Sequence, residues 1–262
     1  RTTIECGFAT ESSRFTVRYS LRAGSQLLDV SLDADWHEQE QRLQWVLPTD
    51  LRALDAVCGT QFGHVRRARH SNTSWDIARF EVCAHRYVGV SEPSFGAAIV
   101  ADGPRGYDIR GDALRLTLLR SPRFPDPEAD LGFQHLEWSV MLTDGDPVLS
   151  GVEEIAALMA HPVRVVDGAP QLPASGIALS VPGALISAVK PADDDSTDFI
   201  VRVWESRGGR TNGTLSVAGA ARIISCDALE NPIDAPLDMV SDGVFSLSLR
   251  PFQIATLRIT TA

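Results

Sequence analysis

The chain has 262 residues, with 24 Lys and Arg against 34 Asp and Glu, and a formal net charge of −10. This length fits one large β domain or two smaller ones. The acidic balance argues against a nucleic-acid-binding protein, which needs a basic face. No apolar run approaches the roughly 20 residues of a membrane-spanning helix. We therefore expect neither nucleic acid nor a membrane as a partner.

The chain begins at Arg1 without a methionine and shows no charged-then-apolar leader. We therefore expect a fragment of a longer protein and no secretory signal. Its four cysteines are Cys6, Cys58, Cys83 and Cys226, and none forms a CxxC pair of the kind found in zinc ribbons or thioredoxin-like sites. We predict that they are small buried hydrophobic residues in a reducing compartment, which favours a cytoplasmic protein.

Alternation of apolar and polar residues with a period of two predicts strands along most of the chain. The predicted strands are Phe15–Leu21, Leu27–Leu32, Leu114–Leu118, Phe199–Trp204, Thr214–Val217, Val244–Leu249 and Ile254–Ile259. Between them the helix formers of Gly151–Ala160, with Pro162 just beyond, predict one short helix. Many strands, tight Gly-containing turns and almost no helix predict an all-β sandwich architecture.

A stretch rich in glycine and proline, residues 166–176, predicts a linker. It divides the chain into a longer part, residues 1–165, and a shorter part, residues 175–262. The shorter part has about the length of one small sandwich of immunoglobulin size. The longer part contains nearly all the unusual polar residues.

Several specific motifs follow one another in order. They are VSLDADWHE (30–38), FGHVRR (62–67), NTSWDIARFEVCAHRYVGVSE (72–92), GYDIRG (106–111), LRLTLLRSPRFPDPEAD (114–130), VRVWESRGGR (201–210) and LRPFQIATL (249–257). The series resembles the C-terminal β region of the glycoside hydrolase family 38 α-mannosidases. Tyr87 and Gly89 depart from it, since the family usually has Trp and often Asp at these places.

The resemblance implies a galactose-mutarotase-like supersandwich over residues 1–165, followed by a small β-sandwich. It implies retaining hydrolysis of terminal α-mannosides by two carboxyl groups. It also implies a divalent metal, expected to be zinc, held by two His and two Asp on an N-terminal domain. None of the six histidines of this chain fits the His-x-Asp ligand pair. We therefore expect no catalytic residue and no metal site in this chain, which alone would be inactive.

The expected role is to wall the active-site cleft of the missing catalytic domain. That domain, α-mannoside glycans and further copies of the chain are the expected partners. The resemblance suggests Arg120, Tyr107 and Asp108 as residues that contact substrate. A guanidinium can bond sugar hydroxyls in a fork, and a tyrosine ring can stack on a sugar face. Structural alternatives stay open, namely an ion pair of Arg120 with Asp126 or Asp130 and a core position for Tyr107.

The carboxylates of Asp126, Glu128 and Asp130 lie in a proline-rich loop and could bind calcium or form a catalytic pair. A structural loop or an interdomain contact is the favoured interpretation. His85 and Arg86 are predicted to form a buried polar pair within an apolar strand. Trp36-His37-Glu38, Trp75-Asp76 and Ser91-Glu92 are expected in packing or at the face toward the missing domain.

A different function class also fits, namely a free-standing, non-catalytic carbohydrate-binding or scaffolding module. A large exposed apolar patch would favour the enzyme part, whereas a polar surface with one aromatic platform would favour the module. A mutarotase-type epimerase, with His85 and Glu92 as nominal acid and base, is the third hypothesis.

Overall fold

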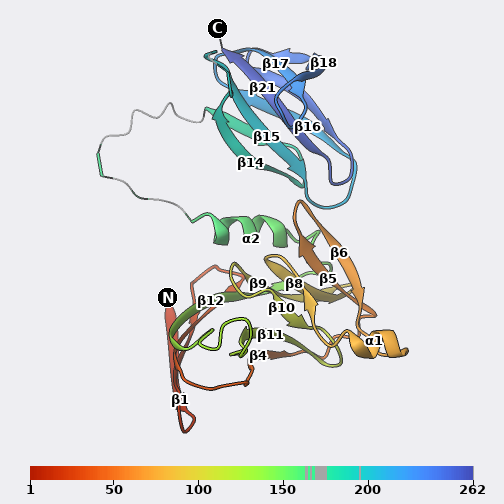
Figure 1. The fold of residues 1–262 in the computed structure, drawn as a ribbon. Helices are drawn as coiled ribbons and strands as arrows, with labels where there is room; N and C mark the ends of the chain where they lie inside the picture. The colour runs from red at the N-terminus through yellow and green to blue at the C-terminus, as the bar shows by residue number, and fades with distance from the viewer. Residues whose placement is uncertain (163–164, 166, 169–175, 195, 262) are drawn as a thin grey trace. The chain divides into compact units, whose positions relative to one another are not determined.

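The computed structural model describes residues 1–262 except 163–164, 166, 169–175, 195 and 262 (Figure 1). Most of the predicted linker, residues 166–176, lies outside the described residues. The chain folds into two compact units. Unit 1 comprises Arg1–Thr60 and Val65–Val163, and unit 2 comprises Gln61–His64 and Arg164–Ala262.

Unit 1 contains two sheets. The eight-stranded sheet has the order β1-β2-β3-β12-β9-β8-β5-β6, and the four-stranded sheet has the order β4-β11-β10-β7. The strands of the larger sheet are β1 (Thr2–Ala9), β2 (Arg14–Leu21), β3 (Leu27–Trp36), β5 (Asp55–Thr60), β6 (Gly63–Ala68), β8 (Tyr87–Glu92), β9 (Phe95–Ala101) and β12 (Gly132–Thr143). Those of the smaller sheet are β4 (Leu43–Pro48), β7 (Val82–Cys83), β10 (Gly106–Asp108) and β11 (Ala113–Leu119). Two helices, α1 (Ser74–Ala78) and α2 (Val152–Ala160), complete the unit.

The main core of unit 1 lies between its two sheets. Alternation turns Val30 and Leu32 of β3 inward, where they share one cluster with Leu114 and Leu116 of β11. A second apolar cluster covers the opposite face of the larger sheet, where α2 packs on β8 and β9. These two strands are buried on both faces, so they read as continuous apolar runs and show no alternation.

Unit 2 is a smaller sandwich with a core of its own. One sheet has the order β13-β16-β20-β19 and the other the order β14-β15-β21-β17-β18. The strands are β13 (Ile177–Ser180), β14 (Ala184–Pro191), β15 (Phe199–Glu205), β16 (Thr211–Val217), β17 (Ala220–Cys226), β18 (Pro232–Pro236), β19 (Met239–Ser241), β20 (Val244–Leu249) and β21 (Ile254–Thr261). Inward residues of both sheets form the core, among them Val201, Leu215, Phe245 and Leu257.

The predicted all-β class is confirmed, and each predicted strand coincides with an observed one. The predicted helix corresponds to α2, whereas the short α1 was not predicted. It begins at a Thr73 cap whose side chain accepts from the Asp76 N–H, while the Asp76 carboxylate accepts from the Thr73 N–H. No helix among the described residues is long and apolar enough to cross a membrane.

The cysteine prediction is correct for only half of the residues. All four are free, and Cys58 and Cys226 are buried as expected. Cys6 and Cys83 are exposed. Cys6 lies on β1, all of whose residues are exposed, and Cys83 ends β7, at the edge of the smaller sheet.

Candidate functional site

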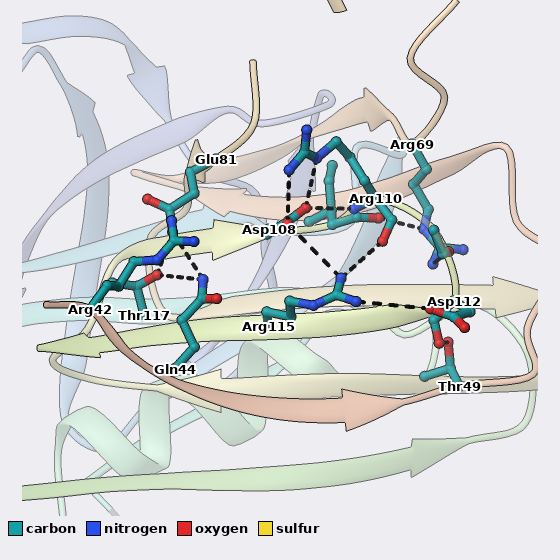
Figure 2. Close-up of polar contacts among 12 residues, drawn as sticks. Arg42, Gln44, Thr49, Arg69, Glu81, Asp108, Arg110, Asp112, Arg115 and Thr117 are labelled. Carbon is teal, nitrogen blue, oxygen red and sulfur yellow. Dashed lines mark hydrogen bonds and ion pairs between the residues drawn. The ribbon is translucent and has the colours of Figure 1, made fainter. Parts of the chain in front are cut away.

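The outer face of the four-stranded sheet carries a polar network that includes Asp108, one of the sequence-predicted site residues (Figure 2). Antiparallel pairing sets Asp108 of β10 opposite Arg115 of β11, and Tyr107 opposite Leu116. Because successive strand residues face opposite sides, Tyr107 and Leu116 enter the core while Asp108 and Arg115 face outward.

Asp108 is enclosed by arginine. Arg110 Nε and Nη2 donate to its two carboxylate oxygens at 3.0 Å each, and the Arg110 backbone N–H donates at 3.0 Å. Arg115 Nη1 lies 3.9 Å from Oδ2. Burial alone would raise the pKa of Asp108, but the hydrogen bonds and charge of Arg110 outweigh it, so the pKa lies below its ordinary value. Asp108 is therefore an ionised structural anchor for Arg110.

On the same face of the sheet, the carboxylate of Glu81 links a second group of polar side chains. Its Oε1 accepts from Thr117 Oγ1 at 2.5 Å, Arg42 Nη1 at 2.9 Å and Gln44 Nε2 at 3.1 Å. Gln44 Nε2 also donates to Thr117 Oγ1 at 3.0 Å. Side chains from β4, β11 and the segment before β7 are thus linked across the sheet (Figure 2).

Arg69 fixes the turn that carries Arg110, and sequence reasoning missed it. Its side chain is buried, and its guanidinium donates to the backbone carbonyls of Ile109 (2.7 Å), Gly111 (2.5 Å), Leu51 (3.2 Å) and Ala53 (3.5 Å). Burial lowers the pKa of Arg69 from its ordinary value. The FGHVRR motif stops at Arg67, and no local pattern marks an arginine whose partners are distant carbonyls.

Tyr107 lies in the core of unit 1. The sequence leaves this core position open as the alternative to a contact with substrate. Its ring is 0% exposed, and its hydroxyl donates to Pro104 O at 3.5 Å. Burial raises the pKa of the Tyr107 hydroxyl above its ordinary range. In unit 1 the ring therefore has no face open to a sugar, and its contribution is to packing.

The loop after β11 is organised by Asp130. One of its carboxylate oxygens accepts from the backbone N–H groups of Arg120 at 2.9 Å and Ser121 at 3.0 Å. Trp36 Nε1 donates to Ser121 Oγ, which attaches the same loop to β3. Asp130 thus binds the backbone of Arg120 and leaves the guanidinium exposed, without an ion-pair partner among the described residues.

The other carboxylates of this loop do not form a ligand cluster. Asp126 Oδ1 accepts from the Glu128 backbone N–H at 2.9 Å, a bond local to its own turn. No group of three or more His, Cys, Asp or Glu is placed to hold a metal ion in the parts of the chain that the structure describes. The described carboxylates of this loop therefore do not form a set of cation ligands.

The prediction for His85 and Arg86 needs correction. They lie in the bend between β7 and β8, outside any strand, and both are half-buried. Arg86 has a positive φ of 72° in this bend. Arg86 Nη1 lies 4.0 Å from Oε1 of the buried Glu153 of α2, so its charge partner comes from the helix.

Glu92 is the nominal partner of His85 in the epimerase hypothesis. Its Oε1 accepts a hydrogen bond from the Arg52 backbone N–H at 2.9 Å, which is a structural bond.

Two family models match the chain. The C-terminal domain of the glycosyl hydrolases of family 38 matches residues 1–128, and the C-terminal β-sandwich domain of the same family matches residues 184–257. The fold and these matches define the class, an all-β C-terminal region of a glycosyl hydrolase. The chain belongs to glycosyl hydrolase family 38.

Two curated relatives resemble most of the chain. Human alpha-mannosidase 2C1 is 32% identical over 94% of the chain, and an alpha-mannosidase of Saccharomyces cerevisiae is 30% identical over 88%. The crystal structure of an alpha-mannosidase from Enterococcus faecalis V583 shares the fold, with a TM-score of 0.80 at 17% identity over 95% of the chain. The chain spans 24% of the length of each of the two relatives and 29% of the solved chain.

Proposed function

We propose that the chain is the C-terminal β portion of a retaining, metal-dependent α-mannosidase that hydrolyses terminal α-mannosides. The observation that carries the proposal is the match of nearly the whole chain to proteins named alpha-mannosidase. The catalytic carboxyl groups and the zinc ligands would belong to the remaining part of the longer protein. This portion would support and wall the substrate cleft.

The surface of unit 1 supports a role beside a further domain. Large apolar side chains in and just after α1 face solvent, with Trp75 75% exposed, Ile77 60% and Phe80 55%. Monomeric proteins rarely leave such groups clustered without a covering partner. We propose that the catalytic domain covers this segment.

The proposal also includes self-association of the chain and a cytoplasmic location. Four free thiols support the cytoplasmic location.

Arg120 is the residue we propose to contact the sugar. Its backbone is held by Asp130 while its guanidinium stays exposed, so a fixed main chain presents a side chain with five N–H donors. A guanidinium so placed can bond two vicinal hydroxyls of a mannoside. Asp126 and Asp130 would act indirectly, by shaping the loop.

Hydrolysis of an aryl α-mannoside, with zinc added, tests the division of labour. We expect turnover from the full-length protein and none from residues 1–262 alone. Metal-dependent turnover by residues 1–262 would refute the proposed location of the catalytic groups. In the full-length protein, Arg120→Ala should lower kcat/KM at least about tenfold. Arg123→Ala is the matched control, because Arg123 lies in the same loop and pairs with Glu40 at 3.3 Å.

The alternative, a free-standing carbohydrate-binding module, is favoured by one observation. Phe124, in the same loop as Arg120, is 85% exposed and could serve as an aromatic platform for a sugar ring. Saturable binding of α-mannosides by residues 1–262, abolished in Phe124→Ala, would support this module. Absence of such binding would leave the enzyme portion as the better account.

A further inference from the structure

A cavity of about 180 Å³ opens in unit 1 beside the polar face described above. Its polar wall consists of Arg66, Arg67, His70, Asp76, Arg79 and Arg110. Val82 and Ile109 contribute apolar surface. Four arginines thus meet at one small cavity in a chain whose net charge is −10.

Two of these arginines already have carboxylate partners. Arg66 pairs with Asp55 at 3.0 Å and with Asp146, and Arg110 is held by Asp108. For Arg67 and Arg79 there is no ion pair within the described part of the chain. Arg67 lies near the Cys58 thiol, whose pKa burial raises to about 11, so this neighbour is neutral. Neither guanidinium is therefore held in a close ion pair, although the pKa of Asp76 is lowered by its hydrogen bonds with Thr73 and also by the charge of Arg79.

One carboxylate in the lining, that of Asp76, would repel a bound anion. It is engaged by its own neighbours, since Oδ2 accepts from the Thr73 hydroxyl at 2.8 Å and from the Thr73 N–H at 3.1 Å. His70 Nδ1 lies 3.5 Å from the same oxygen. Among the described residues that line the cavity, Asp76 is the only carboxylate and four are arginines. The carboxylates that pair with Arg66 and Arg110 lie outside the lining, so the lining itself presents mainly guanidinium groups.

The backbone that carries these arginines is fixed before any ligand arrives. Arg69 bonds the carbonyls on either side of Arg110, those of Ile109 and Gly111. The Arg79 N–H donates to Asp76 O at 3.1 Å at the end of α1. Less conformational entropy is therefore lost when these side chains bind a ligand.

We propose that this cavity binds a small phosphorylated molecule, with Arg67, Arg79 and Arg110 around the phosphate group. A guanidinium is always charged and matches the oxygens of a phosphate with paired N–H donors. The volume admits a phosphate with a small attached group. Val82 and Ile109 offer apolar contact to that group. The site is separate from the Arg120 loop and does not need mannosidase activity. Its Asp76 and Arg79 belong to the α1 segment whose apolar side chains we propose the catalytic domain covers, so the ligand would bind beside that interface.

Isothermal titration calorimetry on residues 1–262, at constant ionic strength, tests the site with two probes, inorganic phosphate and glycerol 3-phosphate. Saturable binding of either probe is expected. Arg79→Ala should weaken it about tenfold, as should Arg67→Ala. Arg79→Lys keeps the charge but loses the paired donors, so it should recover only part of the affinity.

The control is Arg14→Ala, which removes an exposed arginine of β2 outside the cavity lining and should leave the affinity unchanged. Tighter binding of glycerol 3-phosphate supports a phosphate ester as the ligand, and equal binding supports free phosphate. No saturable binding of either probe, or equal weakening in Arg14→Ala and Arg79→Ala, would overturn the proposal. Circular dichroism of each variant checks that it is folded.

Discussion

Unit 1 and unit 2 each use one buried charged side chain to hold loop backbone, but the charges have opposite signs. In unit 1 the Arg69 guanidinium donates to four backbone carbonyls, those of Leu51, Ala53, Ile109 and Gly111. In unit 2 the Glu205 carboxylate accepts from four backbone N–H groups, those of Arg207 (2.8 Å), Gly208 (2.8 Å), Gly209 (3.2 Å) and Phe252 (3.0 Å).

The two buried side chains hold backbone segments that differ in what they carry. In unit 2 Glu205 holds its own turn and the Phe252 N–H, so its VRVWESRGGR motif has a structural reason. In unit 1 Arg69 and Asp130 fix the main chain near Arg110 and Arg120 while those two side chains point to a cavity or to solvent. In unit 1 the fixed main chain thus carries arginine side chains that line a cavity or face solvent.

The largest expected effect is the loss of Glu205. Glu205 is 1% exposed, and Glu205→Ala would leave four partly buried N–H groups without their acceptor. We expect the free energy of unfolding to fall by about 4 kcal/mol, measured by urea denaturation. The exposed Asp242→Ala should change it by less than about 0.5 kcal/mol. A loss below about 1 kcal/mol for Glu205→Ala would contradict the proposed role.

Removal of Arg69 should have the next largest effect. Arg69→Ala leaves four carbonyls short of a donor, so we expect a loss of about 3 kcal/mol in unfolding free energy. Amide hydrogen exchange should accelerate around Ile109–Gly111, which the side chain now holds. Arg69→Lys should restore only part of the stability, because an ammonium has fewer donors and no planar fork. Full restoration by lysine would show that the charge alone matters.

A change of pH should act on the two units in opposite directions. In unit 1 burial raises the pKa of Glu153 to about 7 against the opposing charge of Arg86, well above the ordinary value of 4.5. The stability it contributes is complete below about pH 4.5 and is lost as pH rises through about 7. Glu153→Gln stays neutral, so it should remove this decline, which amounts to at most about 3 kcal/mol.

Unit 2 supplies the contrast. Hydrogen bonds from Ser196 and Arg258 lower the pKa of Asp194 to about 2. Its contribution is present above the ordinary value of 3.8 and is lost as pH falls toward 2. Hydrogen exchange followed in each unit between about pH 2 and 8, corrected for the intrinsic exchange rate at each pH, can separate the two trends. Glu128→Gln, in an exposed loop, is the control for Glu153→Gln. A decline in unit 1 that persists in Glu153→Gln would refute the assignment.

The smallest effect is expected at Asp130. It is half-buried and holds only two N–H groups, so Asp130→Ala should lower the unfolding free energy by about 1 kcal/mol. In the full-length protein the same variant should lower kcat/KM, because Arg120 loses its fixed backbone. A larger stability loss than that of Glu205→Ala would reverse the proposed order of the two carboxylates.

Much of the fold could be predicted because alternation and turn residues are local signals. The strands over Phe15–Leu21 and Val244–Leu249, for example, have one face in a core and one in contact with solvent. Strands β8 and β9 lack this contrast because the main core and α2 bury both of their faces, so alternation could not reveal them. The same pattern could not reveal α1, which has only five residues and no buried side chain.

The sequence by itself determined the all-β class, the position of α2 and the motif series that indicated the family. Only the tertiary structure decided that Tyr107 is in the core, that Asp108 is bound by Arg110 and that Asp130 holds the backbone of Arg120. It also brought Arg67, Arg79 and Arg110 around one cavity and gave Arg69 its four carbonyls. The physical reason is range: strand periodicity depends on neighbours along the chain, whereas ion pairs, burial and cavities depend on residues that meet only after folding.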